Sequence, residues 1–361
     1  MKSWDVVIAG GGIVGVSLAR ELRKHGASVL VVERGEPGRE ASHAAAGMTA
    51  WCDPMLPAPL SLLARASGGM YPEFVRELED ESGIRVDLRS EGHIVYFEQP
   101  LEEKAAEWNG LTADDVARLE PRLEYSGQPA YLTPEGSVDP RALIAASVKA
   151  AKHRGVEIAS GSGVTEIEVE NDRPVAVKTA KTRYAAGAVV NCCGAWSGQI
   201  GPLRFPTRPV KGQMLCLVAA KPVLIEHVVR APDVYIVPRS DGRMLVGSTL
   251  EEAGFDKRVD PEIIQSLRQA ATALIPELGE ARMLESWAGL RPGTPDALPL
   301  LGATEIDNYF VAAGHYRDGI LLSPVTASVM SHVVRGVAPE FDLSPFSPSR
   351  FSPRPGTAVA G

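Results

Sequence analysis

Cysteine is scarce in this chain. Only four of its 361 residues are cysteines: Cys52, Cys192, Cys193 and Cys216. They form no CxxC motif and no spacing typical of a zinc site, so the sequence predicts neither a disulfide scaffold nor a metal site. This cysteine usage is typical of a reducing compartment, and we expect a cytoplasmic protein.

Basic residues are outnumbered, and long apolar runs are missing. The chain has 37 Lys and Arg residues against 45 Asp and Glu residues, which gives a net charge of -8. Nucleic-acid binding requires a basic surface, so we expect no nucleic-acid partner. No apolar run reaches the roughly 18 residues of a membrane helix, so no membrane span is expected. Residues 6–16 are apolar, but the glycines within them and Asp5 before them argue against a signal peptide.

Aromatic residues make up only 6% of the chain, whereas its 35 glycines and 28 prolines favour many tight turns. The proportions of hydrophobic (45%) and charged (23%) residues are typical of a globular protein and exclude a wholly disordered or fibrous one. At roughly 150 residues per domain, the length favours about two domains.

The N-terminal segment has the pattern of a βαβ unit. Residues 5–9 form a short apolar run typical of a buried parallel strand, and a helical pattern follows to about His25. Gly26 suits the end of that helix, because glycine readily adopts a positive φ. Residues 28–32 predict a second buried strand, which ends at Glu33. Such a unit is typical of nucleotide-binding domains.

Three glycines between the first strand and the helix form a GxGxxG motif. Gly10 allows a sharp turn, Gly12 lets the backbone approach a pyrophosphate, and Gly15 lets helix and strand pack closely. The helix N-terminus offers free N–H groups to phosphates, and Glu33 is placed to hydrogen-bond ribose hydroxyls. The alternative is a glycine-rich turn without a ligand, but the surrounding strand, helix and second strand favour a dinucleotide site.

The motif alone does not distinguish NAD from FAD. The chain has no second GxGxxG motif for a separate nicotinamide domain. A further strand-to-helix junction with glycines occurs at 313–320, and a helix N-terminus there would favour the negative charge that a flavin gains on reduction. Both observations favour FAD.

The rest of the pattern predicts two interleaved domains. We expect helices at 139–155, 261–275 and 320–334, strands at 164–192 and 309–313, and antiparallel strands at 92–97 and 205–250. The predicted fold is α/β (mixed α+β), with a Rossmann-like FAD-binding domain and an interleaved antiparallel-sheet substrate domain. We assign residues 1–85, 139–203 and 291–345 to the first domain, 86–138 and 204–290 to the second, and 346–361 to a C-terminal tail.

Five segments carry a resemblance that spans nearly the whole chain. They are residues 41–48 (ASHAAAGM), 208–213 (RPVKGQ), 235–239 (YIVPR), 287–294 (WAGLRPGT) and 315–322 (HYRDGILL). In these segments, and in their order, the chain resembles the glycine oxidase branch of the D-amino-acid oxidase family, the flavoenzymes of thiamine biosynthesis.

The resemblance implies which residues bind FAD. Those expected at its adenosine and pyrophosphate half are Ile13, Val14, Glu33, Arg34, Ala41 and Ser42, with Val164 holding the adenine through its backbone. Those expected around the flavin are Ala46, Gly47, Met48, His315, Tyr316, Arg317, Asp318, Gly319, Ile320 and Leu321. Related dehydrogenases attach flavin covalently to a histidine near the position of His43. Here that histidine is one residue out of step, so non-covalent FAD is expected, with His43 as a polar neighbour.

The resemblance also implies that Arg291, Arg317 and Tyr235 are the catalytic residues that bind the substrate, with Met48 beside them. A guanidinium suits an amino-acid carboxylate because it donates two parallel hydrogen bonds. We expect Arg291 in a loop bounded by glycine and proline, with a surface ion pair as its alternative. Tyr235 could instead be a half-buried sheet residue, Arg317 a counter-charge for FAD or a carboxylate, and Met48 ordinary core packing. Asp233 stands where glycine oxidases can carry histidine, which changes the polarity at the pocket mouth.

The implied reaction is FAD-dependent oxidative deamination of glycine, and of sarcosine and small D-amino acids, by hydride transfer to the flavin. The products are the imino acid or glyoxylate, ammonia and hydrogen peroxide, with molecular oxygen as the electron acceptor. Two alternatives stay open: a D-amino-acid or secondary-amine dehydrogenase that uses another acceptor, and a flavin-bearing subunit without activity. The family also implies a homo-oligomer, which we expect to be a tetramer.

Overall fold

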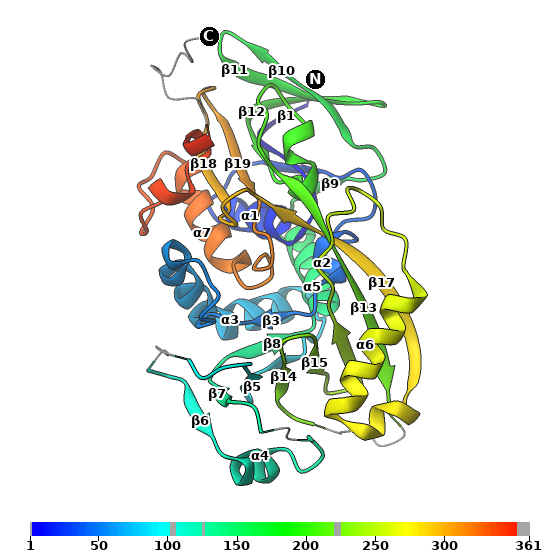
Figure 1. Cartoon of the computed structure of the whole chain (residues 1–361). Coiled ribbons are helices and arrows are strands. Elements are labelled where there is room, and N and C mark those ends of the chain that lie inside the picture. The colour runs from blue at the N-terminus through cyan, green and yellow to red at the C-terminus, as the bar shows by residue number, and fades with distance from the viewer. Residues whose placement is uncertain (1, 102–105, 125–126, 220–224, 352–361) are drawn as a thin grey trace, which may run out of the picture.

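A computed structural model describes residues 2–101, 106–124, 127–219 and 225–351, which form two large sheets, one small sheet and the helices packed on them (Figure 1). Of the predicted C-terminal tail, residues 352–361 lie outside the described residues. The part before them is packed against the protein, since Phe346 is 1% exposed and belongs to the main hydrophobic core.

The first sheet is built around the N-terminal strand. Its order is β10 (Val164–Glu170), β11 (Arg173–Thr179), β12 (Arg183–Asn191), β1 (Ser3–Ala9), β2 (Val29–Val32) and β9 (Glu157–Ala159), with β19 (Tyr309–Ala313) also beside β12 and β18 (Leu300–Ala303) beside β19. The strands β9, β2, β1, β12 and β19 pair in parallel. This confirms the predicted Rossmann-like fold, in which the central strands are buried on both faces and therefore apolar throughout.

Four helices share one hydrophobic core with a face of the first sheet: α1 (Ile13–Lys24), α3 (Ser61–Ser82), α5 (Pro140–His153) and α7 (Ser323–Val334). The start of α5 follows from its sequence, because Asp139 accepts hydrogen bonds from the backbone of Arg141 and Ala142, and Pro140 occupies the first helical position. The other face of the sheet packs a second cluster that includes Trp4, Phe205 and Tyr309.

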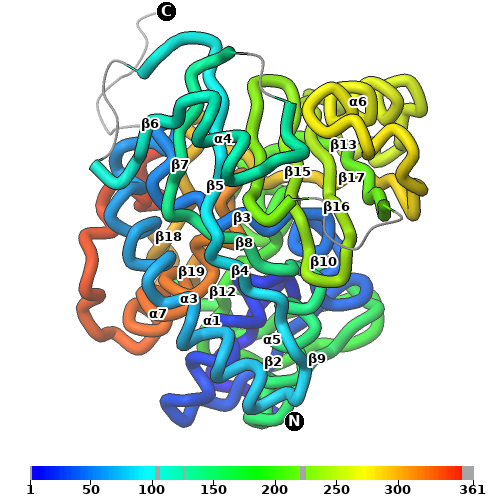
Figure 2. The backbone as a smooth tube through the Cα atoms, turned by 90° about the horizontal axis from the view of Figure 1, so that it is seen from below, coloured from blue at the N-terminus to red at the C-terminus, as the bar shows by residue number. Residues whose placement is uncertain are grey.

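The second sheet carries the other half of the molecule. Its order is β17 (Arg282–Gly293), β13 (Arg208–Val218), β16 (Arg243–Gly247), β15 (Tyr235–Pro238), β14 (Val228–Arg230), β5 (His93–Tyr96), β7 (Ala130–Thr133) and β6 (Asn109–Leu111). Helices α4 (Ala113–Leu119) and α6 (Pro261–Leu274) share a core with this sheet. Figure 2 shows α4, α6 and these strands on one side of the molecule and α1, α3 and α7 on the other.

The remaining elements are short. A small sheet has the order β3 (Met48–Thr49), β8 (Gly136–Val138) and β4 (Leu88–Arg89). The helix α2 (Ala41–Ala44) and five 3-10 turns, η1 (Ala58–Leu60), η2 (Gly194–Gln199), η3 (Pro276–Glu280), η4 (Ser344–Phe346) and η5 (Pro348–Phe351), complete the described residues. No helix in the described ranges is long and apolar enough to cross a membrane.

The structure corrects three local predictions. The helix predicted at 320–334 begins only at Ser323, because residues 319–322 form a turn. The second sheet is not wholly antiparallel, since β14 and β5 pair in parallel. Arg291 lies within β17 and not in a loop, with Val210 of β13 opposite it. Pro292, which suggested a turn, is tolerated because β17 is an edge strand and can lack an N–H donor.

The 22-residue helix α3 is absent from the predicted elements. Gly68 and Gly69 lie within it, and Pro72 interrupts its hydrogen-bonding pattern, so its sequence has a low intrinsic helix preference. Packing against α5 and α7 stabilises the helix despite this low preference. Leu63, Tyr71 and Leu78 are buried in the shared core. The predicted division into two domains stays a prediction, and its boundary at 290/291 falls inside β17.

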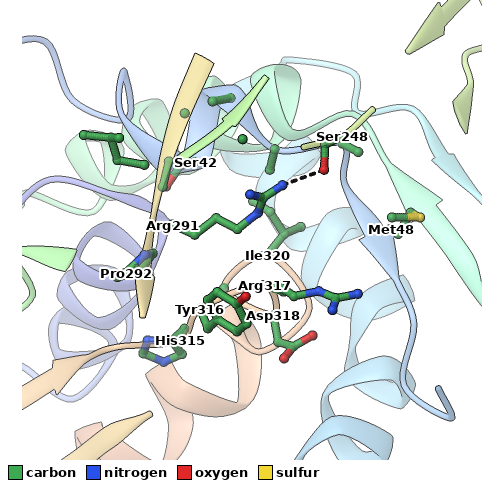
Figure 3. Close-up of a pocket in the computed structure, with 18 of the residues that line it drawn as sticks. Ser42, Met48, Ser248, Arg291, Pro292, His315, Tyr316, Arg317, Asp318 and Ile320 are labelled. Atoms are coloured by element: carbon green, nitrogen blue, oxygen red, sulfur yellow. Dashed lines mark hydrogen bonds between the residues drawn. The ribbon is translucent and has the colours of Figure 1, made fainter. Parts of the chain in front are cut away.

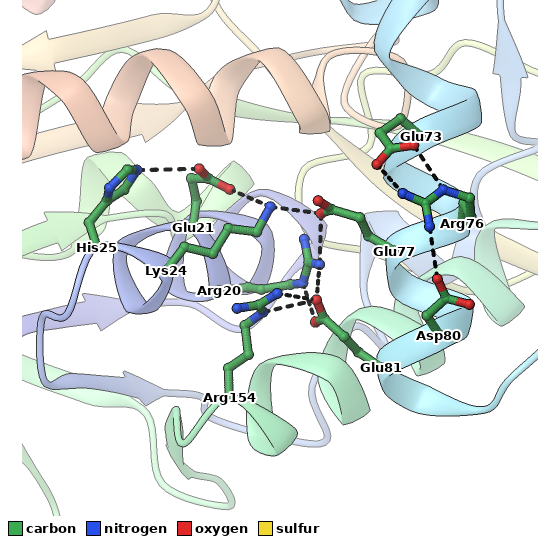
Figure 4. A network of polar contacts seen from close by, with 10 residues as sticks. All are labelled: Arg20, Glu21, Lys24, His25, Glu73, Arg76, Glu77, Asp80, Glu81 and Arg154. Atoms are coloured by element: carbon green, nitrogen blue, oxygen red, sulfur yellow. Dashed lines mark hydrogen bonds and ion pairs between the residues drawn. The ribbon is translucent and has the colours of Figure 1, made fainter.

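An ion network joins α1, α3 and the end of α5 (Figure 4). The side chain of Arg20 is 2% exposed, and its guanidinium donates to Glu77 (2.9 Å) and Glu81 (2.7 Å). Arg154 donates to the same Glu81 from Nε at 2.9 Å. Burial alone would raise the pKa of Glu81, but the hydrogen bonds from Arg20 and Arg154 outweigh burial and lower it to about 2.

Replacing Glu81 by Gln should lower the free energy of unfolding by about 3 kcal/mol near neutral pH, because Arg20 then stays buried without its main counter-charge. The folded-state pKa of Glu81 lies below its ordinary value of 4.5, so its stabilisation is complete above that value and is lost as the pH falls towards 2. Urea unfolding at neutral and acidic pH measures the effect, and the difference between the two proteins should shrink in acid.

The matched control is Glu73→Gln, which removes the same charge from the exposed side of α3, where Glu73 pairs with Arg76. Exposed pairs contribute little, so this variant should unfold nearly like the unmodified protein. Equal stability of the Glu81 and Glu73 variants at neutral pH would contradict the role given to the network.

Candidate active site

A cavity of about 1320 Å³ lies between the first and second sheets. Gly10 and Gly12 line it from the first sheet, and Gly212, Tyr235 and Arg291 line it from the second. The volume exceeds the roughly 300–1,000 Å³ of ordinary small-molecule sites, so there is room for a dinucleotide and a second ligand together.

The glycine loop after β1 presents backbone N–H groups to this cavity. Gly10 has a φ of 105°, and a Cβ on Gly10 or Gly15 would overlap a backbone carbonyl. The N-cap residue of α1 is Gly12, which has no side chain to cap the helix, and the first turn has no acidic residue. The Ile13 N–H donates to Ser42 Oγ (3.0 Å), whereas the N–H groups of Val14 and Gly15 have no acceptor within the helix. This end of the cavity therefore fits an anionic pyrophosphate.

Glu33 lies at the end of β2, where ribose hydroxyls are expected. One carboxylate oxygen accepts a hydrogen bond from the Gly11 N–H (2.8 Å) and the other from the Gly35 N–H (2.9 Å), which fixes its orientation at the cavity wall. Beside it, the Arg34 guanidinium lies 3.6 Å from the centre of the Trp196 ring. Together these groups offer hydrogen-bond acceptors and a flat cationic surface, which suit a nucleoside.

The structure brings most of the predicted cofactor residues to one cavity wall. Those that line it are Gly10, Gly12, Ile13, Val14, Glu33, Arg34, Ala41, Ser42, Ala46, Gly47, Met48, Val164, His315, Tyr316, Arg317, Asp318, Gly319 and Ile320. Gly15 and Leu321 do not. Gly15 instead allows the close approach of α1 to β1, and Leu321 is 1% exposed in the core beneath the cavity.

His43 itself does not line the cavity, although its chain neighbours Ser42 and Ala44 do, and its expected place beside the cofactor stays a prediction. Its Nε2 lies 2.9 Å from Nη1 of Arg39. Burial and the positive charges of Arg141 and Arg39 lower the pKa of His43, so the ring is neutral near pH 7.

Arg291 is held in place by acceptors from three neighbouring residues (Figure 3). Its Nη1 donates to the carbonyls of Lys211 (3.3 Å) and Thr249 (3.1 Å), and its Nη2 donates to Ser248 Oγ (2.6 Å). A Cβ at position 212 would overlap the guanidinium, so Gly212 leaves the space that Arg291 occupies. The surface ion pair considered for Arg291 is therefore absent, since these described partners are neutral.

Tyr235 lies on β15 and lines the same cavity. Its hydroxyl lies 3.6 Å from the sulfur of Met214. A Cβ on Gly247, its partner on β16, would lie 2.8 Å from the tyrosine oxygen, so this glycine makes room for the hydroxyl. Tyr235 is thus a partly buried sheet residue and a cavity residue at once.

The loop between β19 and α7 supplies the remaining charges. Within the described residues, the side chain of Arg317 has no hydrogen bond or ion pair, and it extends into the cavity (Figure 3). His315 is buried, its Nε2 lies 3.1 Å from Thr326 Oγ1, and burial lowers its pKa to about 4. His315 is therefore neutral near pH 7 and stabilises the loop through a hydrogen bond.

Sequence reasoning did not single out several residues of this wall: Asp53, Trp196, Gly212, Arg230, Ser248 and Thr249. Gly212 lies inside the RPVKGQ segment, and that segment was the available signal for it. The others come from loops and strand ends, which are brought together only by the packing of the two sheets.

No group of three or more His, Cys, Asp or Glu side chains within the described ranges could hold a metal ion.

Comparison with known proteins gives a consistent result. The chain matches the family model described as FAD dependent oxidoreductase over residues 5–333. It is 36% identical to the glycine oxidase of Geobacillus kaustophilus, over 96% of this chain and 97% of that protein. A crystal structure of glycine oxidase from the same organism superimposes with a TM-score of 0.91, at 34% identity, and covers 97% of this chain.

Another relative is longer than this chain. The bifunctional protein ThiO/ThiG of Synechocystis is 36% identical over 98% of this chain, but the chain spans only 56% of that protein. The match over residues 5–333, together with the near-complete alignment to a glycine oxidase, establishes that this chain belongs to the FAD dependent oxidoreductase family.

Proposed function

We propose that this chain oxidatively deaminates glycine to glyoxylate, ammonia and hydrogen peroxide, with sarcosine and small D-amino acids as further substrates. The observation that carries the proposal is the anchored guanidinium of Arg291 in the same cavity as the GxGxxG loop. An amino acid bound there by its carboxylate would lie within the cavity that also suits the dinucleotide. The glycine oxidase relative supports the choice of substrate class.

The cofactor would be held by the residues that line the first-sheet side of the cavity. The α1 N-terminus would bind the pyrophosphate, Glu33 the ribose, and Arg34 with Val164 the adenosine end. When bound, FAD supplies the hydride acceptor and passes the electrons on to oxygen. We include in this proposal the division of the chain into a cofactor domain and a substrate domain.

Arg291 would anchor the substrate carboxylate. A guanidinium has five N–H donors, and its three hydrogen bonds to described residues leave two for a ligand. Two donors on one planar group suit a carboxylate, which accepts two parallel hydrogen bonds. The protein acceptors limit the motion of Arg291, so little conformational entropy is lost on binding.

Tyr235, Arg317 and Met48 would complete the substrate end. Tyr235 offers a hydroxyl donor, Arg317 a second cation, and Met48 an apolar contact, all from the same cavity. Holding the α-carbon in one orientation supplies much of the acceleration, because a bound reactant is already close to the attack geometry.

The proposal also includes the pathway, the cellular location and the assembly of the enzyme. Similarity to a protein named ThiO/ThiG supports a role in thiamine biosynthesis. A cytoplasmic location, oxygen as the second substrate and assembly into a homo-oligomer follow from the proposed class of enzyme.

Replacing Arg291 by Ala should raise the KM for glycine. Losing a charged hydrogen-bond partner costs about 2–4 kcal/mol of substrate binding, or about 30- to 1,000-fold. Steady-state kinetics with glycine measure the effect. Arg208→Ala, on β13 at an exposed position paired with Glu252, is the matched control. An unchanged KM in the Arg291 variant would refute the carboxylate assignment.

The variant Gly212→Ala tests the same anchor without touching Arg291. The new Cβ would displace the guanidinium, and a shift of about 1 Å in a positioned group can lower kcat/KM by about 100-fold. FAD content should stay at its normal level, since Gly212 lies on the second sheet. Gly110→Ala, where a Cβ meets open space, should behave like the unmodified enzyme.

Oxygen use is tested by measuring peroxide and glyoxylate together. We expect one peroxide per glyoxylate with glycine, and slower turnover as the side chain of a D-amino acid grows. The assay should include glycine, sarcosine, D-alanine, D-proline and larger D-amino acids. Turnover with an artificial dye but none with oxygen would identify a dehydrogenase instead.

A further inference from the structure

Asp318 presents a carboxyl group to the cavity without a protein partner. Its side chain lines the same cavity as Arg291 and Tyr235, next to Arg317 on the loop before α7 (Figure 3). Within the described residues, no hydrogen bond or ion pair to this carboxylate is present, although the residue is only partly exposed. The carboxylate is therefore available to a molecule bound in the cavity.

The loop does not need this side chain for its shape. The backbone N–H of Asp318 donates to the His315 carbonyl (2.9 Å), and its own carbonyl accepts from the Leu322 N–H (2.8 Å). These two bonds form the turn that leads into α7, and the carboxylate takes part in neither. A purely structural role for the acid is therefore not supported.

Charged groups from three segments surround Asp318. Arg317 is its chain neighbour, Asp53 comes from the loop after β3, and Arg230 comes from the end of β14. Arg230 is already paired with Asp53, and its Nη1 lies 3.5 Å from Glu135. Burial, together with the negative charge of Asp53, outweighs the two arginines and raises the pKa of Asp318 to about 6.

We propose that Asp318 is a catalytic residue that accepts a proton from the substrate ammonium group. This inference rests on the proposed oxidation of glycine. The substrate enters as a zwitterion, one N–H bond of the ammonium breaks, and an O–H bond forms on the Asp318 carboxylate. The nitrogen keeps the electron pair and becomes the neutral amine that can lose hydride from its α-carbon.

The local charges bring the pKa of the substrate ammonium group and the pKa of Asp318 closer together. Near pH 7 the carboxylate of Asp318 is mostly ionised, since its pKa is about 6. A substrate held between Arg291 and Arg317 has positive charges near its ammonium group, and these lower the pKa of the amine. Both effects narrow the gap between the pKa of the donor and that of the acceptor, as efficient proton transfer requires.

The variant Asp318→Asn tests the proposal, because the amide keeps the size of the side chain but cannot take up a proton. At about pH 7 its kcat/KM for glycine should fall by about 100-fold or more, which is the usual contribution of a general base. The loss should diminish above about pH 9, where free amine is already abundant in solution. In the unmodified enzyme, kcat/KM should fall below pH 6, and the variant should lack this step.

Two further variants serve as controls. Glu98→Gln removes the same charge from an exposed position on the same cavity and should keep the pH profile of the unmodified enzyme. Asp318→Glu retains a proton acceptor and should restore part of the activity at neutral pH. Because Asp318 is also among the residues expected around the flavin, the FAD content of each variant is measured and kcat/KM is expressed per bound FAD.

A binding measurement separates this proposal from turnover. The probe is 2-aminoisobutyrate, which carries an ammonium and a carboxylate but has no α-hydrogen and cannot be oxidised. Its affinity for the FAD-loaded protein should weaken below pH 6, and this pH step should be missing in Asp318→Asn.

The inference is overturned if Asp318→Asn oxidises glycine with the pH profile of the unmodified enzyme, or if its defect is loss of FAD. Failure of the unmodified enzyme to oxidise glycine would refute the proposed function instead. Even then, the 2-aminoisobutyrate titration would report whether ionised Asp318 favours the binding of an amino acid's ammonium group.

Discussion

The guanidinium of Arg291 occupies the volume in which any residue other than glycine at position 212 would place its Cβ. The end of the cavity that we propose for the substrate depends on this close approach. Three acceptors on β13 and on the segment after β16 then fix the guanidinium. Gly247 provides comparable space for the hydroxyl of Tyr235. The second sheet can therefore place two large polar side chains against its own backbone, where they face the first sheet.

The sequence predicts the start of the first sheet well because the residues that specify it lie close together in the chain. The βαβ unit is encoded by apolar runs, three glycines and a terminal acid within about thirty residues, and each has its own steric reason. The glycine oxidase-like segments also point to Arg291, Tyr235 and the loop before α7. What these segments do not reveal is the conformation around Arg291. Pro292 and Gly293 suggest a turn there, but both residues still pair with β13.

The unpredicted parts arise from contacts between distant segments. The helix α3 contains Gly68, Gly69 and Pro72, so its formation depends on packing against α5 and α7 more than on its own propensity. Asp53 and Arg230 lie 177 positions apart in the chain and meet at the cavity, and no local pattern marks either of them. A sequence segment that lines the cavity can also contain residues that do not. Leu321 lies in such a segment, but its side chain packs in the core.

In the proposed function, the two ends of the cavity would recognise their ligands in different ways. At the phosphate end, the donors are backbone N–H groups of α1, which most side-chain substitutions leave unchanged. At the substrate end, the charged and polar groups are side chains from β15, β17 and the loop before α7, and these segments can vary independently. One scaffold can therefore keep its dinucleotide site while its amine specificity changes. In this proposal, groups such as Arg291 and Asp318 determine the choice of substrate, and the fold alone does not.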